Sequence, residues 1–218
     1  MSAPASIFSS SIAKKYWMAI SGLFLIVFLL QHFAINFLSV ISPDLFNEVS
    51  HFMGTNPLVQ FALQPLLIFG VLYHLAMGIK LDLQNKAARP SKYAFEKASE
   101  NAPWVSRNMI ITGMTIFAFL GLHFYDFWVP EIATKYVAGD MSGLLPNGDF
   151  RYYEELVHKM SDPVRVGIYC VAFVLLSLHL MHGFQSAFQS VGTRAGAYKD
   201  LIVKAGQIYA IAIPAGFI

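Results

Sequence analysis

The residues best suited to chemistry in this sequence are histidines that lie inside long apolar stretches. Five of the seven histidines do so, in four different stretches: His32, His74, His123, His179 and His182. An ionisable side chain at bilayer depth is costly and commonly binds an ion or cofactor or relays protons. One such histidine is equally well explained by a hydrogen bond to a neighbouring helix. The presence of at least one histidine in each of four stretches predicts paired imidazole ligands.

The apolar stretches also predict the fold class. Hydrophobic residues make up 56% of the 218-residue chain and charged residues only 13%, against roughly 25% charged residues in soluble domains. Runs of roughly 20 apolar residues, the length that crosses a bilayer, occur at 18–38, 58–79, 108–128, 164–187 and 202–217. We therefore predict an all-α integral membrane bundle of five transmembrane helices, forming one domain over 1–218 with an outer loop at 129–163.

The distribution of basic residues predicts how this bundle is oriented. Lys and Arg concentrate in the N-terminal segment, with Lys14 and Lys15, and in the second and fourth connections, whereas the first connection has none. Because basic loops stay on the cytoplasmic side, we expect a cytoplasmic N-terminus. Trp17, Trp104 and Trp128 lie at predicted span ends, as in aromatic belts. The net charge of +2 shows no basic excess of the kind that indicates nucleic-acid binding.

Counting residues from the predicted span ends places the histidines at two levels. At about 1.5 Å per residue, His32 and His123 lie roughly 21 to 23 Å from the cytoplasmic ends of their spans. His74 and His179 lie roughly 22 to 24 Å from the outer ends of theirs. The spacing predicts an outer pair, His32 with His123, and an inner pair, His74 with His179, about 14 Å apart along the membrane normal.

Two imidazoles that face each other across a helix bundle suit the iron of a haem. Each supplies an axial nitrogen, and iron with both axial positions filled keeps none open for oxygen, so such a centre transfers electrons. Four histidines at two separated levels do not make one tetrahedral zinc site. We therefore predict two non-covalent haems b, with the metal ligands His74, His179, His32 and His123.

Glycines next to the inner pair support this interpretation. Gly78 and Gly183 follow His74 and His179 by four residues, on the same helix faces, and would let a flat macrocycle lie against the backbone. Membrane helices also use glycine simply for packing. His182 competes with His179 as a ligand, but the shared His-x-x-x-Gly spacing favours His179.

Further polar residues are candidates for contact with the cofactors. Ser21, Arg107 and His182 are placed on the inner side, where haem propionates would need donors, although positive-inside topology explains basic residues there equally well. A quinone headgroup needs hydrogen-bond partners and a proton acceptor. The outer-side candidates for that site are Glu48, His51, Gln31 and Asp126.

The order of these residues resembles a known family, the single-chain, five-helix, dihaem cytochrome b anchors of succinate:quinone oxidoreductases, meaning succinate dehydrogenase or fumarate reductase. The resemblance covers essentially the whole chain. It is carried by residues 14–23, Gln31-His32-Phe33, His74-x-x-x-Gly78, Leu122-His123-Phe124 and His179-x-x-x-Gly183-Phe184-Gln185-Ser186.

The resemblance implies a multi-pass subunit of a bacterial inner membrane with two partners on the cytoplasmic side, a flavoprotein subunit that oxidises succinate and an iron–sulfur subunit. Electrons would then pass through the inner haem, the outer haem and menaquinone. The succinate site would lie outside this chain, with quinone chemistry at this subunit.

Two other interpretations use the same histidines. The chain is also compatible with the cytochrome b subunit of a hydrogenase or formate dehydrogenase, which has different soluble partners. From another class, it is compatible with a membrane transporter without haem whose histidines relay protons or bind a substrate.

Overall fold

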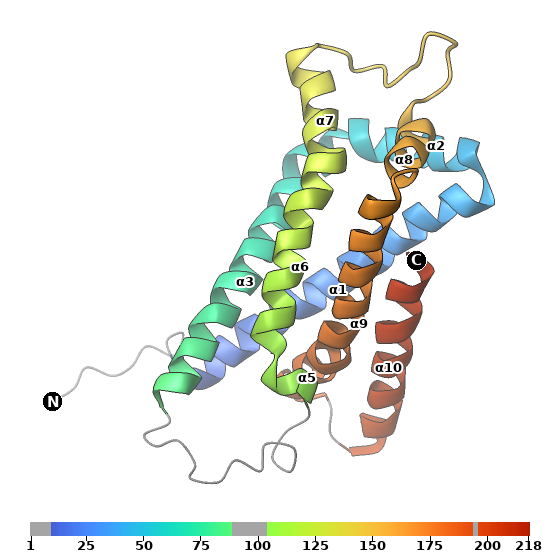
Figure 1. The fold of residues 1–218 in the computed structure, drawn as a ribbon. Coiled ribbons are helices and arrows are strands. Elements are labelled where there is room, and N and C mark those ends of the chain that lie inside the picture. Colours follow the sequence, from blue (N-terminus) through green and yellow to red (C-terminus); the bar gives the residue numbers. More distant parts are fainter. Residues whose placement is uncertain (1–9, 89–103, 194–195) are drawn as a thin grey trace, which may run out of the picture.

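The computed structural model describes residues 10–88, 104–193 and 196–218. Regular structure in these residues is helical, apart from a β-bridge between Leu144 and Phe150, so the predicted all-α class is confirmed. Four long helices run through the molecule in alternating directions (Figure 1). They are α1 (Ser11–Ile41), α3 (Gln64–Ala87), α6 (Met109–His123) and α9 (Pro163–Ser190).

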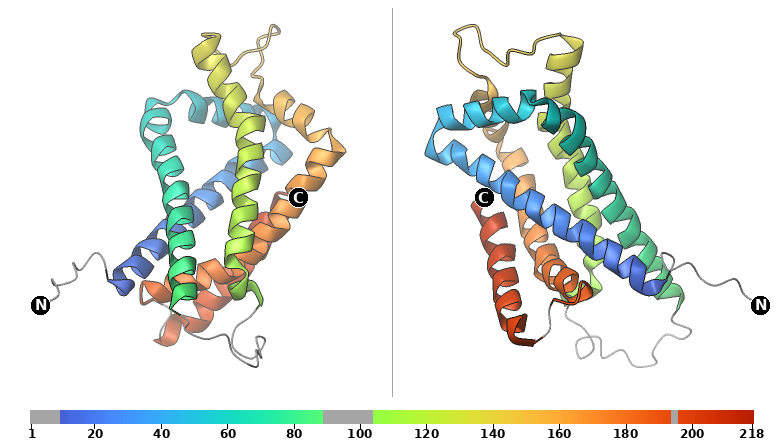
Figure 2. Two further views of the ribbon diagram at one scale, coloured as in Figure 1. Left: turned by 60° about the vertical axis from the view of Figure 1, so that its left-hand side comes forward. Right: turned by 180° about the vertical axis from the view of Figure 1, so that it is seen from behind.

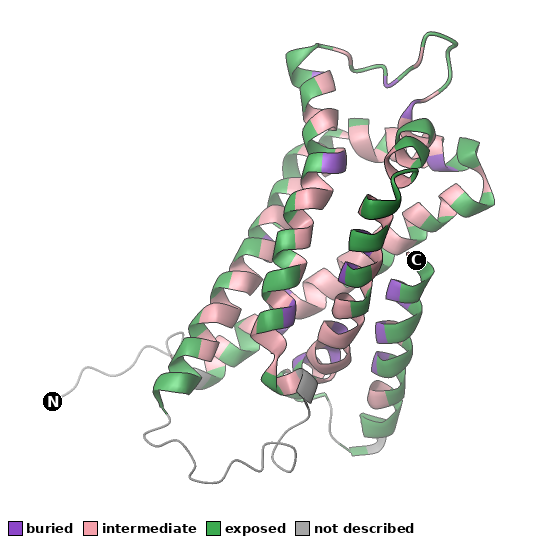
Figure 3. Ribbon diagram, viewed as in Figure 1, coloured by how far each residue is buried: buried purple, intermediate pink, exposed green. Residues whose placement is uncertain are grey.

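These helices and their continuations are the candidate membrane spans. Within the described residues, four helical stretches are long and apolar enough to cross a bilayer, namely Ile12–Ile41, Val59–Ala87, Met109–Val137 and Pro163–Ser190. Exposed residues line their outer faces (Figure 3), and many are large and apolar, including Val27, Phe61, Phe69, Val171 and Val174. Because so much exposed apolar surface is unfavourable in water, these faces suit lipid.

A fifth helix, α10 (Lys199–Gly216), forms where the sequence predicts the fifth span. It packs along α9, with Ala210 and Ile213 buried. Lys199, Asp200 and Lys204 make its first turns more polar than the four candidate spans. The structure therefore shows four candidate spans and a fifth packed helix.

The four long helices form a square bundle. In sequence order around the square, α1 contacts α3, α3 contacts α6, α6 contacts α9, and α9 contacts α1. The diagonals of the square are thus α1 with α6 and α3 with α9. Figure 2 shows α1 running obliquely across the bundle. We call the end where α1 begins the N-terminal end and the end near α2 the opposite end.

Capping residues determine where several helices begin. Ser10 caps α1 by accepting a hydrogen bond from the backbone N–H of Ala13. Ser42 ends α1 and caps α2 (Pro43–Thr55), whose first residue is proline. Asp162 and Pro163 repeat this arrangement at α9. Helix α2 lies where the sequence predicted only a simple connection.

The third span continues beyond its predicted end, so the predicted outer loop at 129–163 is wrong in its first part. The helix passes from α6 through a π-helical segment, Phe124–Trp128, then α7 (Val129–Ile132), and ends at Val137. Pro130 lacks an N–H for the regular ladder, and the widened π-helical turns before it keep the helix continuous. A second π-helical segment, Val59–Leu63, precedes Pro65 in the same way.

Ion pairs hold the connection after Val137 against the opposite end of the bundle. Glu131 pairs with Lys135 and with Arg151, and Lys135 also donates to the carbonyl of Gly54 in α2. Both cations are almost fully buried. Burial alone would lower the pKa of Arg151, but its hydrogen bond to Glu155 and the charge of Glu131 raise it. A short helix, α8 (Tyr152–Met160), follows Arg151 in this connection.

Some predicted features lie outside the described residues. They are the basic residues Arg89, Lys92, Lys97 and Arg194, and the side chain of Trp104, which opens the short helix α5 (Trp104–Arg107).

Candidate metal centres

The structure brings the four predicted ligand histidines together as two pairs. The rings of His74 and His179 have centroids 6.5 Å apart and planes inclined at 68°. Those of His32 and His123 have centroids 5.8 Å apart and planes inclined at 77°. Each pair joins helices on one diagonal of the square, so both pairs lie across the middle of the bundle. This is the pairing predicted from depth.

The ring separations leave room for one metal ion in each pair. Imidazole nitrogens bind metals at about 2.0 Å, and the nitrogen lies about 1 Å from the ring centre. Two imidazoles on opposite sides of one metal therefore have centroids about 6 Å apart. Among the described residues, no group of three or more His, Cys, Asp and Glu side chains is placed to hold a metal ion. Each site thus offers a metal two imidazole ligands.

Hydroxyl groups orient both rings of the His74–His179 pair. Ser21 Oγ lies 3.0 Å from His74 Nδ1, and Thr112 Oγ1 lies 3.1 Å from His179 Nδ1. Each hydroxyl comes from the helix next to its histidine. Ser21 was predicted to lie beside a propionate, whereas the structure gives it the ring of His74 as partner. Thr112 was missed.

The ring that faces His74 belongs to His179, as the glycine parallel indicates, and not to His182. His182 is partly buried on α9, three residues further along. Arg107 is exposed at the end of α5, at the N-terminal end of the bundle.

Aromatic side chains surround the His32–His123 pair. Phe28 stacks on His32 with centroids 5.4 Å apart, and Phe119 stacks on His123 with centroids 6.0 Å apart. Phe217, just beyond α10, lies 5.9 Å from His32, so the end of the chain reaches the level of this pair. His123 Nδ1 is buried without a hydrogen-bond partner among the described residues. This pair therefore differs from the hydroxyl-bonded pair.

The glycines predicted to make room for a macrocycle have space beside them. A Cβ on Gly78 would meet only Met18 Cε, at 3.5 Å, and a Cβ on Gly183 would meet only Met109 Cε, at 3.9 Å. By contrast, a Cβ on Gly70 would lie 2.7 Å from the ring of Phe24. Close helix packing explains Gly70 but not Gly78 or Gly183. The surroundings of the His74–His179 pair therefore fit a flat group lying against these helices.

An internal repeat, of which only the parallel between the second and fourth spans was predicted, relates the two halves of the site. Residues 18–33 match 109–124 at an offset of 91 positions, pairing Met18 with Met109, Ser21 with Thr112 and His32 with His123. The parallel of His74 and Gly78 with His179 and Gly183 has an offset of 105. Helices α1 and α3 thus correspond to α6 and α9. An alignment of the chain with itself would have identified Thr112.

The four predicted quinone-site residues occupy different environments. Gln31 and Glu48 are exposed, on α1 and α2. His51 stacks on Phe150, with ring centroids 4.3 Å apart. Asp126 is buried, 3.1 Å from Arg165 Nε, and accepts a hydrogen bond of 2.9 Å from the hydroxyl of Tyr169.

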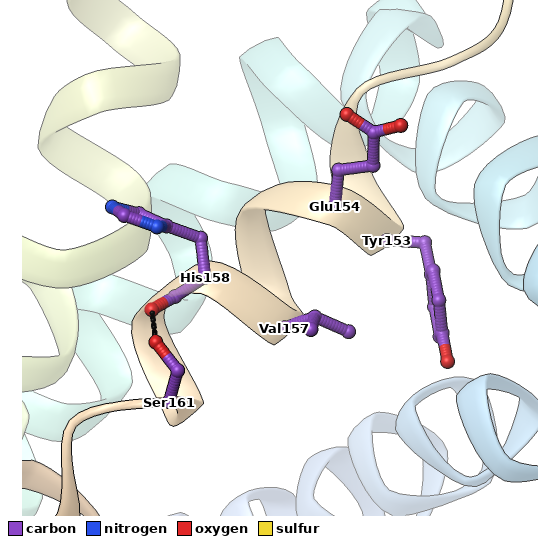
Figure 4. Close-up of a pocket in the computed structure, with 5 residues that line it drawn as sticks. All are labelled: Tyr153, Glu154, Val157, His158 and Ser161. Atoms are coloured by element: carbon purple, nitrogen blue, oxygen red, sulfur yellow. Dashed lines mark hydrogen bonds between the residues drawn. The ribbon is translucent and has the colours of Figure 1, made fainter.

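A hollow along α8 contains none of the predicted site residues. It is lined by Tyr153, Glu154, Val157, His158 and Ser161, where Ser161 donates to the carbonyl of His158 (Figure 4). All its walls come from one short helix and the residue after it. We therefore assign no ligand to it.

Comparisons with known proteins agree with the resemblance predicted from the sequence. The family model of the succinate dehydrogenase/fumarate reductase transmembrane subunit matches residues 15–99, which include His32 and His74. The succinate dehydrogenase cytochrome b558 subunit of Bacillus subtilis (strain 168) is 24% identical over 161 residues, covering 73% of this chain and 69% of that protein. No solved structure matches. The resemblance to membrane subunits of succinate dehydrogenase and fumarate reductase is thereby confirmed.

Proposed function

Since this chain is related to the membrane subunits of succinate dehydrogenase and fumarate reductase, we propose that it carries electrons between an iron–sulfur subunit and a quinone through two haems b. The observation that carries this proposal is the pair of histidines on each diagonal of the bundle. Its further elements are a cytoplasmic N-terminus, a fifth span formed by α10, and a bacterial inner membrane.

The ligand sets favour haem over a bare metal ion. Each centre offers two imidazoles, whereas a protein zinc site usually needs four ligands. A haem would supply most of the iron's nitrogen ligands itself, and His74 with His179, and His32 with His123, would supply the remaining two in each centre. When bound, it supplies one-electron transfer without an open coordination position. The chain contributes ligand nitrogens, ring orientation and an apolar surrounding.

The order of the two centres suits electron transfer across the membrane. Ser21, beside His74, and His32 are separated by eleven residues of α1, about 16 Å of helix. The His74–His179 pair lies toward the N-terminal end, where the iron–sulfur subunit and, beyond it, a flavoprotein subunit would dock. The His32–His123 pair lies toward the opposite end, where menaquinone would be reached.

Haem content and spectra of histidine variants test this proposal. We expect wild-type protein to carry two haems b per chain, in two spectral components. His74→Ala and His179→Ala should each remove the same component, and His32→Ala and His123→Ala should each remove the other. The exposed His158→Ala is the control and should keep both.

Two results would overturn the proposal. A reduced-minus-oxidised spectrum of the wild type without b-type absorption would exclude haem, and loss of different components from His74→Ala and His179→Ala would exclude the pairing. Circular dichroism of each variant separates loss of haem from loss of helix. Two further observations identify the complex: purification of the chain with a flavoprotein and an iron–sulfur subunit, and quinone reduction driven by succinate. Purification with hydrogenase subunits instead would contradict the assignment.

A further inference from the structure

We propose that Ser21 and Thr112 are paired positioning residues, which select Nε2 of His74 and of His179 as the nitrogens that bind the metal. This inference rests on the proposed function and goes beyond it, because it distinguishes the two centres of one chain. It assigns a role to Thr112, and it replaces the propionate role predicted for Ser21.

The backbone contacts of the two hydroxyls indicate which atom donates in their contacts with the histidine rings. Ser21 Oγ donates its one hydrogen to the carbonyl of Met18, at 2.8 Å. Thr112 Oγ1 donates its hydrogen to the carbonyl of Met109, at 3.1 Å. With that hydrogen used on a backbone carbonyl, each hydroxyl oxygen remains an acceptor toward the imidazole. The partner at 3.0 Å or 3.1 Å must then be an Nδ1–H, which leaves the lone pair on Nε2.

Burial keeps these hydrogen bonds from exchanging with water. Ser21 is 7% exposed and Thr112 is 1% exposed. The residue after each hydroxyl is a glycine, and a Cβ on Gly22 or Gly113 would lie 3.4 Å from Cε1 of His74 or His179. Each ring therefore rests against a helix at a point without a side chain, which brings its Nδ1 within reach of the hydroxyl.

The same arrangement occurs twice, once in each half of the repeat. Ser21 and Gly22 face His74 in the first half, and Thr112 and Gly113 face His179 in the second. Serine and threonine differ by one methyl group but share the hydroxyl. Two separate helices thus supply the same acceptor at the same position relative to a ligand ring.

Among the described residues, no hydroxyl group orients the rings of the His32–His123 pair in this way. The amide nitrogen of Asn36 lies 3.5 Å from both ring nitrogens of His32, the limit of a hydrogen bond, and donates at 2.8 Å to the backbone carbonyl of His32. His123 Nδ1 is buried, and no hydrogen-bond partner for it occurs in the part of the chain that the structure describes. Orientation of the rings by hydroxyl acceptors is therefore confined to the His74–His179 centre.

An acceptor on Nδ1–H makes the imidazole a stronger electron donor through Nε2, and such partners commonly contribute 10- to 100-fold in metal affinity. A stronger donor stabilises ferric over ferrous iron. Removal of the acceptors should therefore weaken haem binding and raise the midpoint potential of this centre. A tenfold change in the ratio of ferric to ferrous affinity corresponds to 59 mV for one electron.

The experiment compares Ser21→Ala, Thr112→Ala and the double variant with wild type in the purified membrane complex. Redox titration followed optically, together with the low-spin ferric electron paramagnetic resonance signals, resolves the two components. We expect the component that His74→Ala removes to change its signal, to rise in midpoint potential by about 59 mV, the equivalent of a tenfold change in affinity ratio, and to lose haem sooner. The other component should not move.

Conservative variants keep the test independent of folding. Ser21→Thr and Thr112→Ser preserve the hydroxyl and should restore the wild-type signal and potential. Thr115→Ala is the matched control, because Thr115 is exposed on the same helix and its hydroxyl bonds only to the carbonyl of Ile111. Unchanged signals and potentials in the double variant of a chain that carries two haems would overturn the inference. A wild type without haem would instead overturn the proposed function.

Discussion

Replacing Gly78 by alanine should affect helix stability and cofactor retention in opposite directions. In the protein alone, the new methyl group would meet only Met18 Cε, at an ordinary contact distance of 3.5 Å. Glycine inside a helix is about 0.5–1 kcal/mol less favourable than alanine. The variant without haem should therefore be as stable as wild type or more stable by about that amount. Gly183→Ala should behave alike, since its methyl group would lie 3.9 Å from Met109 Cε.

Retention of haem should nevertheless decrease. Extra methyl groups in a filled site cost about 1–3 kcal/mol, which corresponds to about 5- to 150-fold weaker binding. The rate at which excess apomyoglobin captures haem from the detergent-solubilised protein measures this loss, and the spectrum tells which component is captured. Unfolding in sodium dodecyl sulfate measures the stability of the helices. Only the component that depends on His74 and His179 should be lost faster.

Gly167→Ala is the control, because Gly167 lies on α9 with nothing within 4 Å of an added Cβ. It has the same propensity effect on a helix but no histidine pair beside it. If Gly78→Ala and Gly183→Ala released haem no faster than Gly167→Ala, the space beside these glycines would not be where the macrocycle lies. Helix packing would then be their role.

Two further predictions concern the opposite end of the bundle. Glu131→Gln should lower the free energy of unfolding by about 3 kcal/mol, since Lys135 and Arg151 stay buried with one carboxylate fewer. Denaturant titration measures this loss, with the exposed Glu154→Gln as the control, which should stay within about 0.5 kcal/mol of wild type. Equal stability of the two variants would contradict the prediction. Burial, and then the charge of Glu131, raises the pKa of Tyr152 to about 12. The folded state thus keeps a phenol proton that the unfolded state loses near pH 10, so stability from this group is complete below about pH 10 and is lost toward pH 12. Tyr152→Phe should flatten that part of the stability curve, and parallel curves for the two proteins would show that Tyr152 is not the group responsible.

The pairing of the four histidines could be predicted because helix geometry converts sequence position into depth. A rise of about 1.5 Å per residue, counted along each helix, puts His32 near the level of His123 and His74 near the level of His179. The existence of the spans could be predicted in the same way, from the length of the apolar runs. Neither argument needs the rotation of a helix about its axis, and so both could be made without a structure.

Features that depend on helix rotation and local chemistry were missed. Ser21 was placed at the correct level but assigned to a propionate, because depth alone does not say which neighbour a side chain faces. Helix α2 was overlooked although Ser42, Pro43 and Asp44 form a helix-start signal. The third span was predicted to end at residue 128, where the apolar run stops, whereas π-helical turns carry the helix on to Val137.

The internal repeat explains why the two centres lie where they do. Helices α1 and α6 correspond, and so do α3 and α9, and corresponding helices occupy the diagonals of the square. A histidine that recurs in both halves must then face its own counterpart across the bundle, and both centres lie between the halves. Because the repeat also copies the hydroxyl of Ser21 as Thr112, its symmetry predicts equal orientation of His74 and His179. Asp126, which takes the place of Ile35 in the repeat, breaks that symmetry close to His123, so the differences between the two centres arise where the halves diverge.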